Sequence, residues 1–247
     1  MLNEKYLLVD KIIKSSKSLI VFTGAGMSVE SGIPAFTGNG GLWTKYDPKF
    51  IELDYFFSHP SDSWKQIKHI FYDHMINKAK PNFGHISIAN LEKNGIVKTV
   101  ITQNIDGLHQ LAGSKKVYEL HGTTKTLKCV KCGNIYKDIE INLKTTDIPA
   151  CDKCGGVLKP NFVFYGENLD KYTLNSSIEI IKKADVILII GTSGQVMPAN
   201  QLPFIAKNTN PDIKIIEINP NKSTFTNSIT NYYFQESIVN FFRKITN

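Results

Sequence analysis

Four cysteines carry the clearest chemical signal in the chain. Cys129 and Cys132 form one Cys-x-x-Cys pair, and Cys151 and Cys154 form a second. Two such pairs in a chain without a visible export signal are typical of a tetrahedral zinc site rather than of disulfides. Because the four thiolates fill all four ligand positions, the sequence predicts one structural Zn²⁺ with no place for a catalytic water.

A glycine-rich turn predicts a second kind of chemistry, the binding of a nucleotide. It follows the apolar run Leu19–Phe22, which is typical of a buried parallel strand. Gly24 and Gly26 permit a tight turn and a close approach of the main chain to a ligand. The segment after Gly26 can begin a helix whose free N–H groups face a pyrophosphate. Val29 stands where the dinucleotide fingerprint has its third glycine, so this stretch alone leaves a tight turn without a ligand as an equal alternative.

Further apolar runs predict the elements that must position these residues. Strands are expected over 97–102, 117–120, 162–165, 184–190 and 213–218, and helices over 4–16 and 81–91. His85, in the second of these helices, is expected to be structural rather than a ligand contact. The strands end in small or polar segments, namely Gln103–His109, His121–Gly122, Gly166–Glu167, Gly191–Ser193 and Asn219–Pro220.

These strand ends decide the predicted fold. The carboxyl ends of parallel strands meet at one edge of an open sheet, where ligands bind. The pattern therefore predicts a doubly wound, Rossmann-like α/β fold with a nucleotide-like ligand. The cysteine segment is expected to be an insert, because strands resume on both sides of it.

Composition sets the broad class of protein. The chain has 247 residues, 42% of them hydrophobic, which is enough for a full core. No apolar run approaches the ~20 residues that span a bilayer, and the N-terminus lacks the pattern of a signal peptide. We therefore expect a soluble, cytoplasmic protein without membrane contact. The net charge of +7 is spread over lysines, with Arg243 as the only arginine, which favours an ordinary lysine-rich surface over direct binding of nucleic acid.

Taken together, the motifs resemble the sirtuin family, the NAD-dependent protein lysine deacylases. The resemblance covers nearly the whole chain and keeps the family order of motifs. These motifs are Gly24-Ala25-Gly26-x-Ser28, Gly32-Ile33-Pro34-x-Phe36, Thr102-Gln103-Asn104-Ile105-Asp106, His121-Gly122, the paired cysteines, Tyr165-Gly166-Glu167, Gly191-Thr192-Ser193 and Asn219-Pro220.

The resemblance also implies a division of the chain. A Rossmann-like NAD-binding domain comprises residues 1–40, 86–122 and 159–247. A smaller domain consists of a helical module, 41–85, and a zinc-binding module, 123–158, and NAD lies between the two domains.

The family chemistry implies roles for three catalytic residues. Nicotinamide leaves the ribose through an oxocarbenium-like state, and Asn104 and Asp106 stabilise the developing charge. The amide oxygen of an acylated lysine captures the ribose carbon. His121 removes a proton from a ribose hydroxyl, a task that suits an imidazole near neutral pH. The expected product is O-acyl-ADP-ribose.

Binding roles follow from the same resemblance. The residues expected to bind NAD are Gly24, Ala25, Gly26, Ser28, Ile33, Pro34, Phe36, Gln103, Asn104, Ile105, Asp106, His121, Gly191, Thr192, Ser193 and Asn219. An acylated-lysine peptide is expected to add as a strand between two segments. The residues expected to hold it are Val163, Phe164, Tyr165, Gly166, Glu167, Gly194 and Val196.

Three positions depart from the family pattern. Thr37 stands where the family has an arginine, so a bidentate anion donor is replaced by a short hydroxyl. Members that remove acidic acyl groups carry Tyr-x-x-Arg. Here Tyr72 is followed three residues later by Met75, which favours acetyl or longer apolar acyl groups. Phe234–Ser237 occupies the place of a glycine-containing adenine contact.

Two other functions use the same features. ADP-ribosyl transfer or plain NAD hydrolysis needs the same pocket, and a non-catalytic NAD-sensing module needs only the binding residues. Retention of His121 favours an enzyme over such a module.

Overall fold

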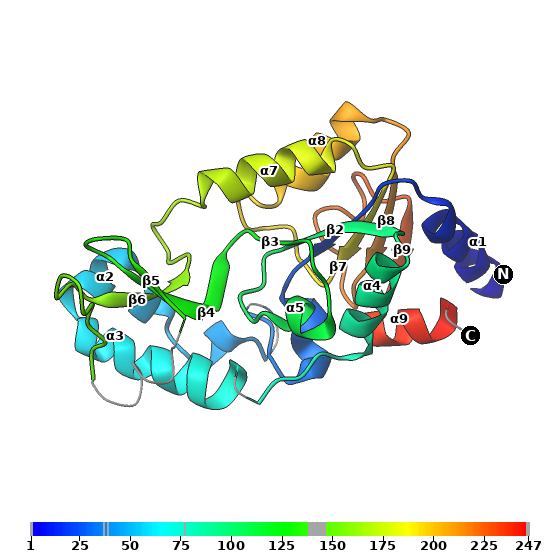
Figure 1. The fold of residues 1–247 in the computed structure, drawn as a ribbon. Helices are drawn as coiled ribbons and strands as arrows, with labels where there is room; N and C mark the ends of the chain where they lie inside the picture. Colours follow the sequence, from blue (N-terminus) through cyan, green and yellow to red (C-terminus); the bar gives the residue numbers. More distant parts are fainter. Residues whose placement is uncertain (1, 37, 39, 77, 138–146, 246–247) are drawn as a thin grey trace.

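The computed structural model describes residues 2–36, 38, 40–76, 78–137 and 147–245, and a six-stranded parallel sheet forms its centre (Figure 1). The strand order is β3-β2-β1-β7-β8-β9, and every neighbouring pair is parallel. The strands are β1 (Leu19–Thr23), β2 (Val97–Thr102), β3 (Val117–Glu119), β7 (Val186–Ile190), β8 (Lys214–Ile218) and β9 (Tyr232–Phe234). The order of the strands reverses between β1 and β7, which is where open α/β sheets bind ligands.

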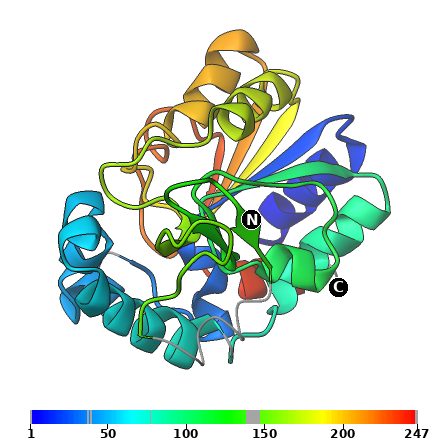
Figure 2. The same ribbon diagram turned by 60° about the vertical axis from the view of Figure 1, so that its left-hand side comes forward.

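Helices cover both faces of this sheet, as the two views in Figures 1 and 2 show. They are α1 (Leu2–Ser15), α4 (Phe83–Lys93), α5 (Leu108–Ala112), α7 (Lys171–Ile181), α8 (Gln201–Thr209) and α9 (Ile238–Ile245). Buried side chains of α1, α4 and α9 form one core, and those of α7 and α8 form another. The predicted doubly wound fold is confirmed.

Strand β1 explains why both faces must be covered. Leu19 and Val21 point into the core under α1, α4 and α9. Ile20 and Phe22 point into the core under α7 and α8. Successive side chains of a strand face opposite sides, so a run that is apolar throughout is stable only between two layers of helices.

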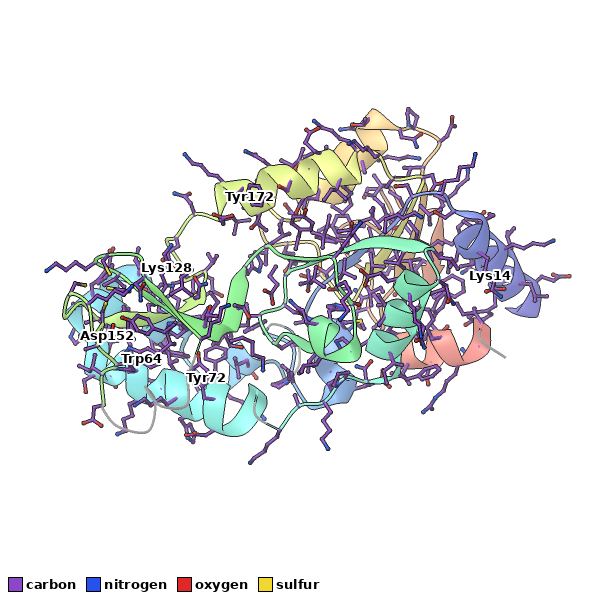
Figure 3. All side chains as sticks on the ribbon, in the orientation of Figure 1. Lys14, Trp64, Tyr72, Lys128, Asp152 and Tyr172 are labelled. Carbon is purple, nitrogen blue, oxygen red and sulfur yellow. The ribbon has the colours of Figure 1, made fainter. Side chains whose placement is uncertain are left out.

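A smaller antiparallel sheet lies beside the large one, with strand order β5-β4-β6. Its strands are β4 (Gly122–Cys129), β5 (Ile135–Tyr136) and β6 (Leu158–Phe162). Helical segments cover it, namely the 3-10 turns η2 (Leu42–Thr44) and η3 (Pro48–Ile51), the helices α2 (Leu53–Ser58) and α3 (Pro60–Ile67), and the π-helix η4 (Lys68–Ile76). The indole Nε1 of Trp64 donates a hydrogen bond of 2.9 Å to the carbonyl of Leu158, which joins α3 to β6 (Figure 3).

One predicted strand is displaced. The run at 162–165 was expected to be a strand, but β6 ends at Phe162 and belongs to the small sheet. Phe162 and Phe164 both pack into the core of the small sheet. The Glu167 carboxylate accepts a 2.7 Å hydrogen bond from the Phe164 N–H and turns the chain there. Among the described residues, no helix has the length and apolarity needed to cross a membrane.

Candidate active site

The glycine turn lies at the reversal point of the large sheet. The Gly24 N–H donates to the Ile190 carbonyl at 3.0 Å, and the Gly26 N–H donates to the Gly191 carbonyl at 2.8 Å. The ends of β1 and β7 are thereby joined directly beneath the expected NAD site. The segment after Gly24 is the 3-10 helix η1 (Ala25–Ser31). A helical start was expected there, and it takes this tighter form.

Gly191 has no room for a side chain. A Cβ there would lie 2.4 Å from the Met27 nitrogen and 2.6 Å from the Gly26 Cα, and φ is +60°. We expect Gly191→Ala to lose about 2–5 kcal/mol of unfolding free energy, from overpacking together with left-handed backbone strain. Gly95→Ala is the matched control, because φ there is +74° and nothing lies within 4 Å.

Urea denaturation of the two glycine variants gives the comparison. Gly95→Ala is expected to lose only the backbone term, about 1 kcal/mol. Equal losses in both variants would show that the contact between β1 and β7 is not tight.

Three polar side chains meet next to this turn. The Ser28 hydroxyl donates to Asp106 Oδ2 at 2.7 Å, and Asn104 Nδ2 donates to Ser28 Oγ at 3.2 Å. The Leu108 N–H donates to Asp106 Oδ1 at 2.9 Å. All three side chains are at most 6% exposed. Residues from η1 and from the end of β2, far apart in sequence, thus form one polar cluster.

A cavity opens onto this cluster. It is lined by Ala25, Ser28, Ile33, Phe36, Phe71, Asn104, Ile105 and Asp106. Seven of these residues were expected from the sequence to bind NAD. Phe71 was not, because it lies in η4 outside every recognisable motif, and its burial could not be inferred from its neighbours.

The charge of Asp106 is set by opposing effects. Burial raises the pKa of its carboxyl group. The hydrogen bonds from Leu108 and Ser28, together with the positive charge of Lys125, act in the other direction. Lys125 was not predicted from the sequence, since it belongs to β4 and approaches Asp106 only through the fold.

His121 lies at the turn between β3 and β4, with one ring nitrogen held by the main chain. His121 Nδ1 is 3.0 Å from the Gln103 carbonyl oxygen. A carbonyl can only accept, so Nδ1 carries the proton and Nε2 carries the lone pair. Burial lowers the pKa of His121, and the hydrogen bond to Gln103 opposes that shift. A neutral imidazole with a basic Nε2 therefore predominates at neutral pH.

Predicted NAD-binding residues at the ends of β2, β7 and β8 also lie together. Gln103 Nε2 donates to Thr192 Oγ1 at 3.1 Å, and Asn219 Nδ2 donates to the Thr192 carbonyl at 2.9 Å. Ser193 accepts through its carbonyl from the Thr224 N–H at 3.1 Å. The ends of β2, β7 and β8 are therefore tied to one another.

The predicted NAD-binding residues Ile33 and Phe36 pack in the core of the small sheet. Ile33 is a buried member of that core, and Phe36 packs against it. The rings of Phe36 and Trp43 are 5.5 Å apart. Pro34 is partly buried beside them. Thr37, where the family has arginine, lies outside the described residues.

The structure places the two segments expected to bind peptide differently. The Val163 N–H donates to the His121 carbonyl at 2.9 Å, which places this segment beside His121. The Tyr165 main chain pairs with Ile51 and Leu53 of the helical module. Val196, in the other segment, is 51% exposed.

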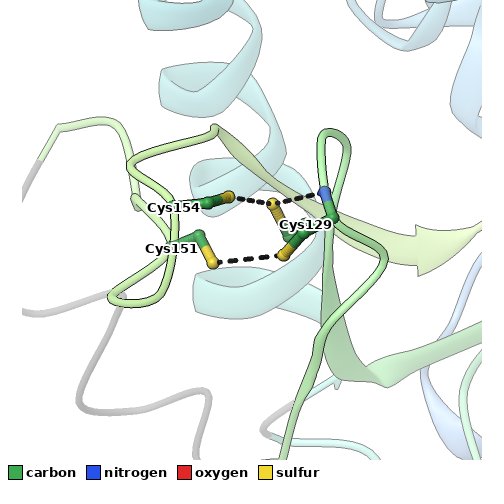
Figure 4. Close-up of side chains that lie close together, drawn as sticks. Cys129, Cys151 and Cys154 are labelled. Atoms are coloured by element: carbon green, nitrogen blue, oxygen red, sulfur yellow. Dashed lines mark hydrogen bonds between the residues drawn. The ribbon is translucent and has the colours of Figure 1, made fainter.

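The four cysteines are clustered in an arrangement suitable for a structural zinc ion. Their Sγ atoms all lie within 4.8 Å of one another, with separations of 3.5 Å for Cys129–Cys154 and 3.6 Å for Cys132–Cys151 (Figure 4). A zinc tetrahedron with Zn–S bonds of about 2.3 Å places its sulfur atoms about 3.8 Å apart. The cluster fits Zn²⁺, as the spacing predicted. The N–H group of Cys132, with that of Lys131, lowers the pKa of the Cys129 thiol, which favours the thiolate.

Two buried histidines make stability depend on pH. Burial lowers the pKa of His85 from 6.5 to about 4, and burial and the neighbouring His85 lower that of His109. The unfolded chain therefore binds protons that the folded chain excludes, so stability is full above pH 6.5 and falls below it. For His85 alone we expect a loss of about 2 kcal/mol between pH 7.5 and pH 5.

Urea denaturation at the two pH values measures this loss. His85→Asn removes the titrating group and is expected to reduce the difference by about the same amount, with groups common to both proteins cancelling. An unchanged difference would contradict the assignment of the effect to His85.

Comparisons with known proteins agree with this geometry. A sequence model of the Sir2 family matches residues 24–198. The NAD-dependent protein deacylase 2 of Pyrobaculum aerophilum is 42% identical over 220 residues, covering 88% of this chain and 86% of the relative. A Sir2 structure bound to acetylated peptide superimposes with a TM-score of 0.87 and 35% identity, covering 100% of this chain and 98% of that one. A Sir2–p53 peptide–NAD⁺ complex gives 0.86 and 36%, covering 96% and 95%.

Proposed function

Because this chain belongs to the Sir2 family, the sirtuins, we propose that His121, Asn104 and Asp106 carry its NAD-dependent chemistry. The protein is an NAD-dependent protein deacylase whose substrates are acylated lysines of proteins or peptides. When bound, NAD supplies an activated ribose carbon with nicotinamide as its leaving group. The acyl group leaves the lysine and ends on ADP-ribose.

The hydrogen bond between His121 Nδ1 and the Gln103 carbonyl is the observation that supports the proposed role of His121. Because Nδ1–H is held by the Gln103 carbonyl, Nε2 is the atom that accepts the proton of a ribose hydroxyl. The main chain fixes the ring through the same bond, so it needs no reorientation before proton transfer. The depressed pKa keeps the base unprotonated at neutral pH.

Asn104 and Asp106 are proposed to face the reacting ribose. Both line the cavity beside Ser28, and the Ser28 hydroxyl fixes one oxygen of Asp106. Prearranged dipoles and a carboxylate in a buried site stabilise positive charge that develops when nicotinamide leaves. The wider NAD-binding set predicted from sequence stays a proposal, supported by the lining of this cavity and by the links among Gln103, Thr192 and Asn219.

The division into domains and the location of the protein are also proposals. The antiparallel sheet and the helical segments that cover it share a core, which supports a smaller domain of 41–85 and 123–158 beside an NAD-binding domain of 1–40, 86–122 and 159–247. Strand β6 (Leu158–Phe162) pairs within the small sheet and so crosses the proposed boundary at 158. A cytoplasmic location is supported by the cysteine cluster, since a reducing compartment keeps four thiols available to zinc.

Apolar acyl groups are favoured over acidic ones, because Met75 stands where the Tyr-x-x-Arg motif has its arginine. None of the described residues that line the cavity is basic. The Tyr72 hydroxyl, which the family's Tyr-x-x-Arg motif uses on acidic groups, donates here to the Thr124 carbonyl at 3.1 Å (Figure 3 shows the residue). A succinyl carboxylate would find no arginine partner in this motif, and burying it unpaired costs several kcal/mol.

A panel of acetyl-, butyryl-, myristoyl- and succinyl-lysine peptides of one sequence tests this preference. We expect turnover of acetyl and longer apolar groups and at least about a hundredfold lower kcat/KM for succinyl. Succinyl turnover equal to acetyl turnover would contradict it. Mass spectrometry of the nucleotide product identifies O-acyl-ADP-ribose in each reaction.

A further inference from the structure

A lysine is buried against the core of the small sheet, and the proposed chemistry does not use it. Lys159 belongs to β6, and only 8% of its side chain is exposed. Its Nζ lies 3.9 Å from the centroid of the ring of Phe164, which is itself buried. An ammonium group is costly in apolar surroundings unless it is paired and hydrogen-bonded. The position of this lysine therefore requires an explanation.

All three ammonium protons of Lys159 have partners. Nζ donates to the carbonyl oxygens of Pro160 at 3.1 Å and of Phe162 at 2.7 Å. It also donates to Glu167 Oε2 at 2.8 Å. Because an ammonium group carries three donors, it is fully hydrogen-bonded. The same Oε2 accepts the Phe164 N–H at 2.7 Å, so the ion pair ties both ends of one short stretch of chain to its middle.

This stretch contains the segment that is expected to hold the peptide. Phe164 is buried, whereas Val163 is half-buried and Tyr165 is exposed. One side of the segment therefore faces the core, and the other is open to a ligand. The Val163 N–H donates to the His121 carbonyl, and the Tyr165 N–H donates to the Ile51 carbonyl, both at 2.9 Å. Such single bonds to other elements hold a segment less firmly than a continuous ladder does, which gives the ion pair on the buried side a role.

We propose that the Lys159–Glu167 ion pair is a latch that holds residues 163–166 in place for an acylated-lysine peptide, so that Lys159 is a positioning residue for substrate. The inference rests on the proposed function, in which the peptide adds as a strand along this segment. Strand addition relies on main-chain hydrogen bonds, and its affinity depends on a main chain that is ordered before the peptide arrives. The carboxylate of Glu167 then serves the peptide by shaping the segment.

The first test needs no substrate. The Phe164 amide exchanges its hydrogen slowly while Glu167 holds it. In Lys159→Met the carboxylate loses its cation, and we expect the Phe164 amide to exchange at least about tenfold faster. Leu188, in β7 of the large sheet, is the reference and should keep its wild-type rate. An unchanged rate at Phe164, or an equal acceleration at Leu188, overturns the latch even if the deacylase chemistry is as proposed.

The second test measures peptide binding. Glu167→Gln removes the charge but keeps the shape and an acceptor for the Phe164 N–H, so it separates the ion pair from packing. An acetyl-lysine peptide is titrated into each variant without NAD. We expect Lys159→Met and Glu167→Gln each to bind it about tenfold more weakly and to raise the KM for peptide equally. The kcat and the KM for NAD should stay within about threefold of wild type.

Two further variants make the comparison sharp. Lys159→Met combined with Glu167→Gln is expected to lose about tenfold rather than a hundredfold in peptide affinity, because either change alone already breaks the latch. The Lys182–Glu179 pair on α7 has the same 2.8 Å separation, but its side chains are 39% and 65% exposed. Lys182→Met is the matched control and is expected to keep wild-type affinity.

Three results contradict the positioning role. They are losses that multiply in the double variant, wild-type peptide affinity in both single variants, and equal rises in the KM for peptide and for NAD. The last of these would indicate general damage to the fold. If wild-type protein binds no acylated peptide and deacylates none, the proposed function fails and the positioning role fails with it. The hold of the ion pair on residues 163–166 is then still decided by the exchange rate of the Phe164 amide.

Discussion

His121→Ala is expected to lower kcat/KM for deacylation by about 10²–10⁴, the usual contribution of a positioned general base. The proposed base is Nε2 of His121, because Nδ1–H is held by the Gln103 carbonyl. Nicotinamide exchange should fall much less, since departure of nicotinamide precedes the proton transfer that we propose for His121. The two rates are measured separately, with labelled nicotinamide for exchange and deacylated peptide for turnover.

A matched histidine controls for general damage. His59 is exposed and stacks on Tyr55 in the helical module, at 4.5 Å between ring centroids. His59→Ala is expected to keep wild-type rates. Equal losses of exchange and deacylation in His121→Ala would place this residue before or at nicotinamide departure and refute its role as the later base.

Cys151→Ser is expected to remove bound zinc and to abolish the folded small domain. Structural zinc sites contribute on the order of 10 kcal/mol to folding, and Cys151 is buried in the core of the small sheet. That same core contains Ile33, Phe71 and Ile105, all of which line the cavity. We therefore expect deacylase activity to fall at least about a hundredfold, although no cysteine is near the reacting atoms.

Metal content and thermal unfolding measure this effect. Wild-type protein should hold one zinc per chain, and chelation should lower its melting temperature reversibly. Lys153→Ala alters an exposed residue between two of the ligands and is expected to keep both zinc and activity. A zinc-free Cys151→Ser protein with wild-type activity would show that the cavity does not depend on the small domain's core.

Sequence alone predicted the parts of the structure that depend on one residue type or on one periodic pattern of apolar residues. The runs at β1, β2, β7 and β8 are mostly apolar and buried at nearly every position, which only a sheet covered on both faces accommodates. The cysteine spacing predicted the metal cluster because each of its two ligand pairs is formed by cysteines only three residues apart in the sequence. The motif order then placed His121 and Asn104 at strand ends.

Long-range packing explains what sequence did not predict. Phe162–Tyr165 has the composition of a strand, yet the Glu167 carboxylate and the small domain's core turn it away from the large sheet. Phe71 and Lys125 approach the site from elements that carry no motif. His85 was expected to be merely structural, and its contact with His109 depends on how α4 and α5 pack. Such contacts join residues whose spacing in sequence follows no period.

The most direct test of the assigned chemistry follows one oxygen atom. Wild-type protein is given NAD and a peptide whose acetyl carbonyl carries oxygen-18, and the products are analysed by mass spectrometry. If the amide oxygen captures the ribose carbon, O-acetyl-ADP-ribose forms in proportion to deacetylated peptide and carries the label on its ribose. Label in free acetate, or nicotinamide release without deacetylated peptide, would contradict this account and indicate hydrolysis or ADP-ribosyl transfer instead.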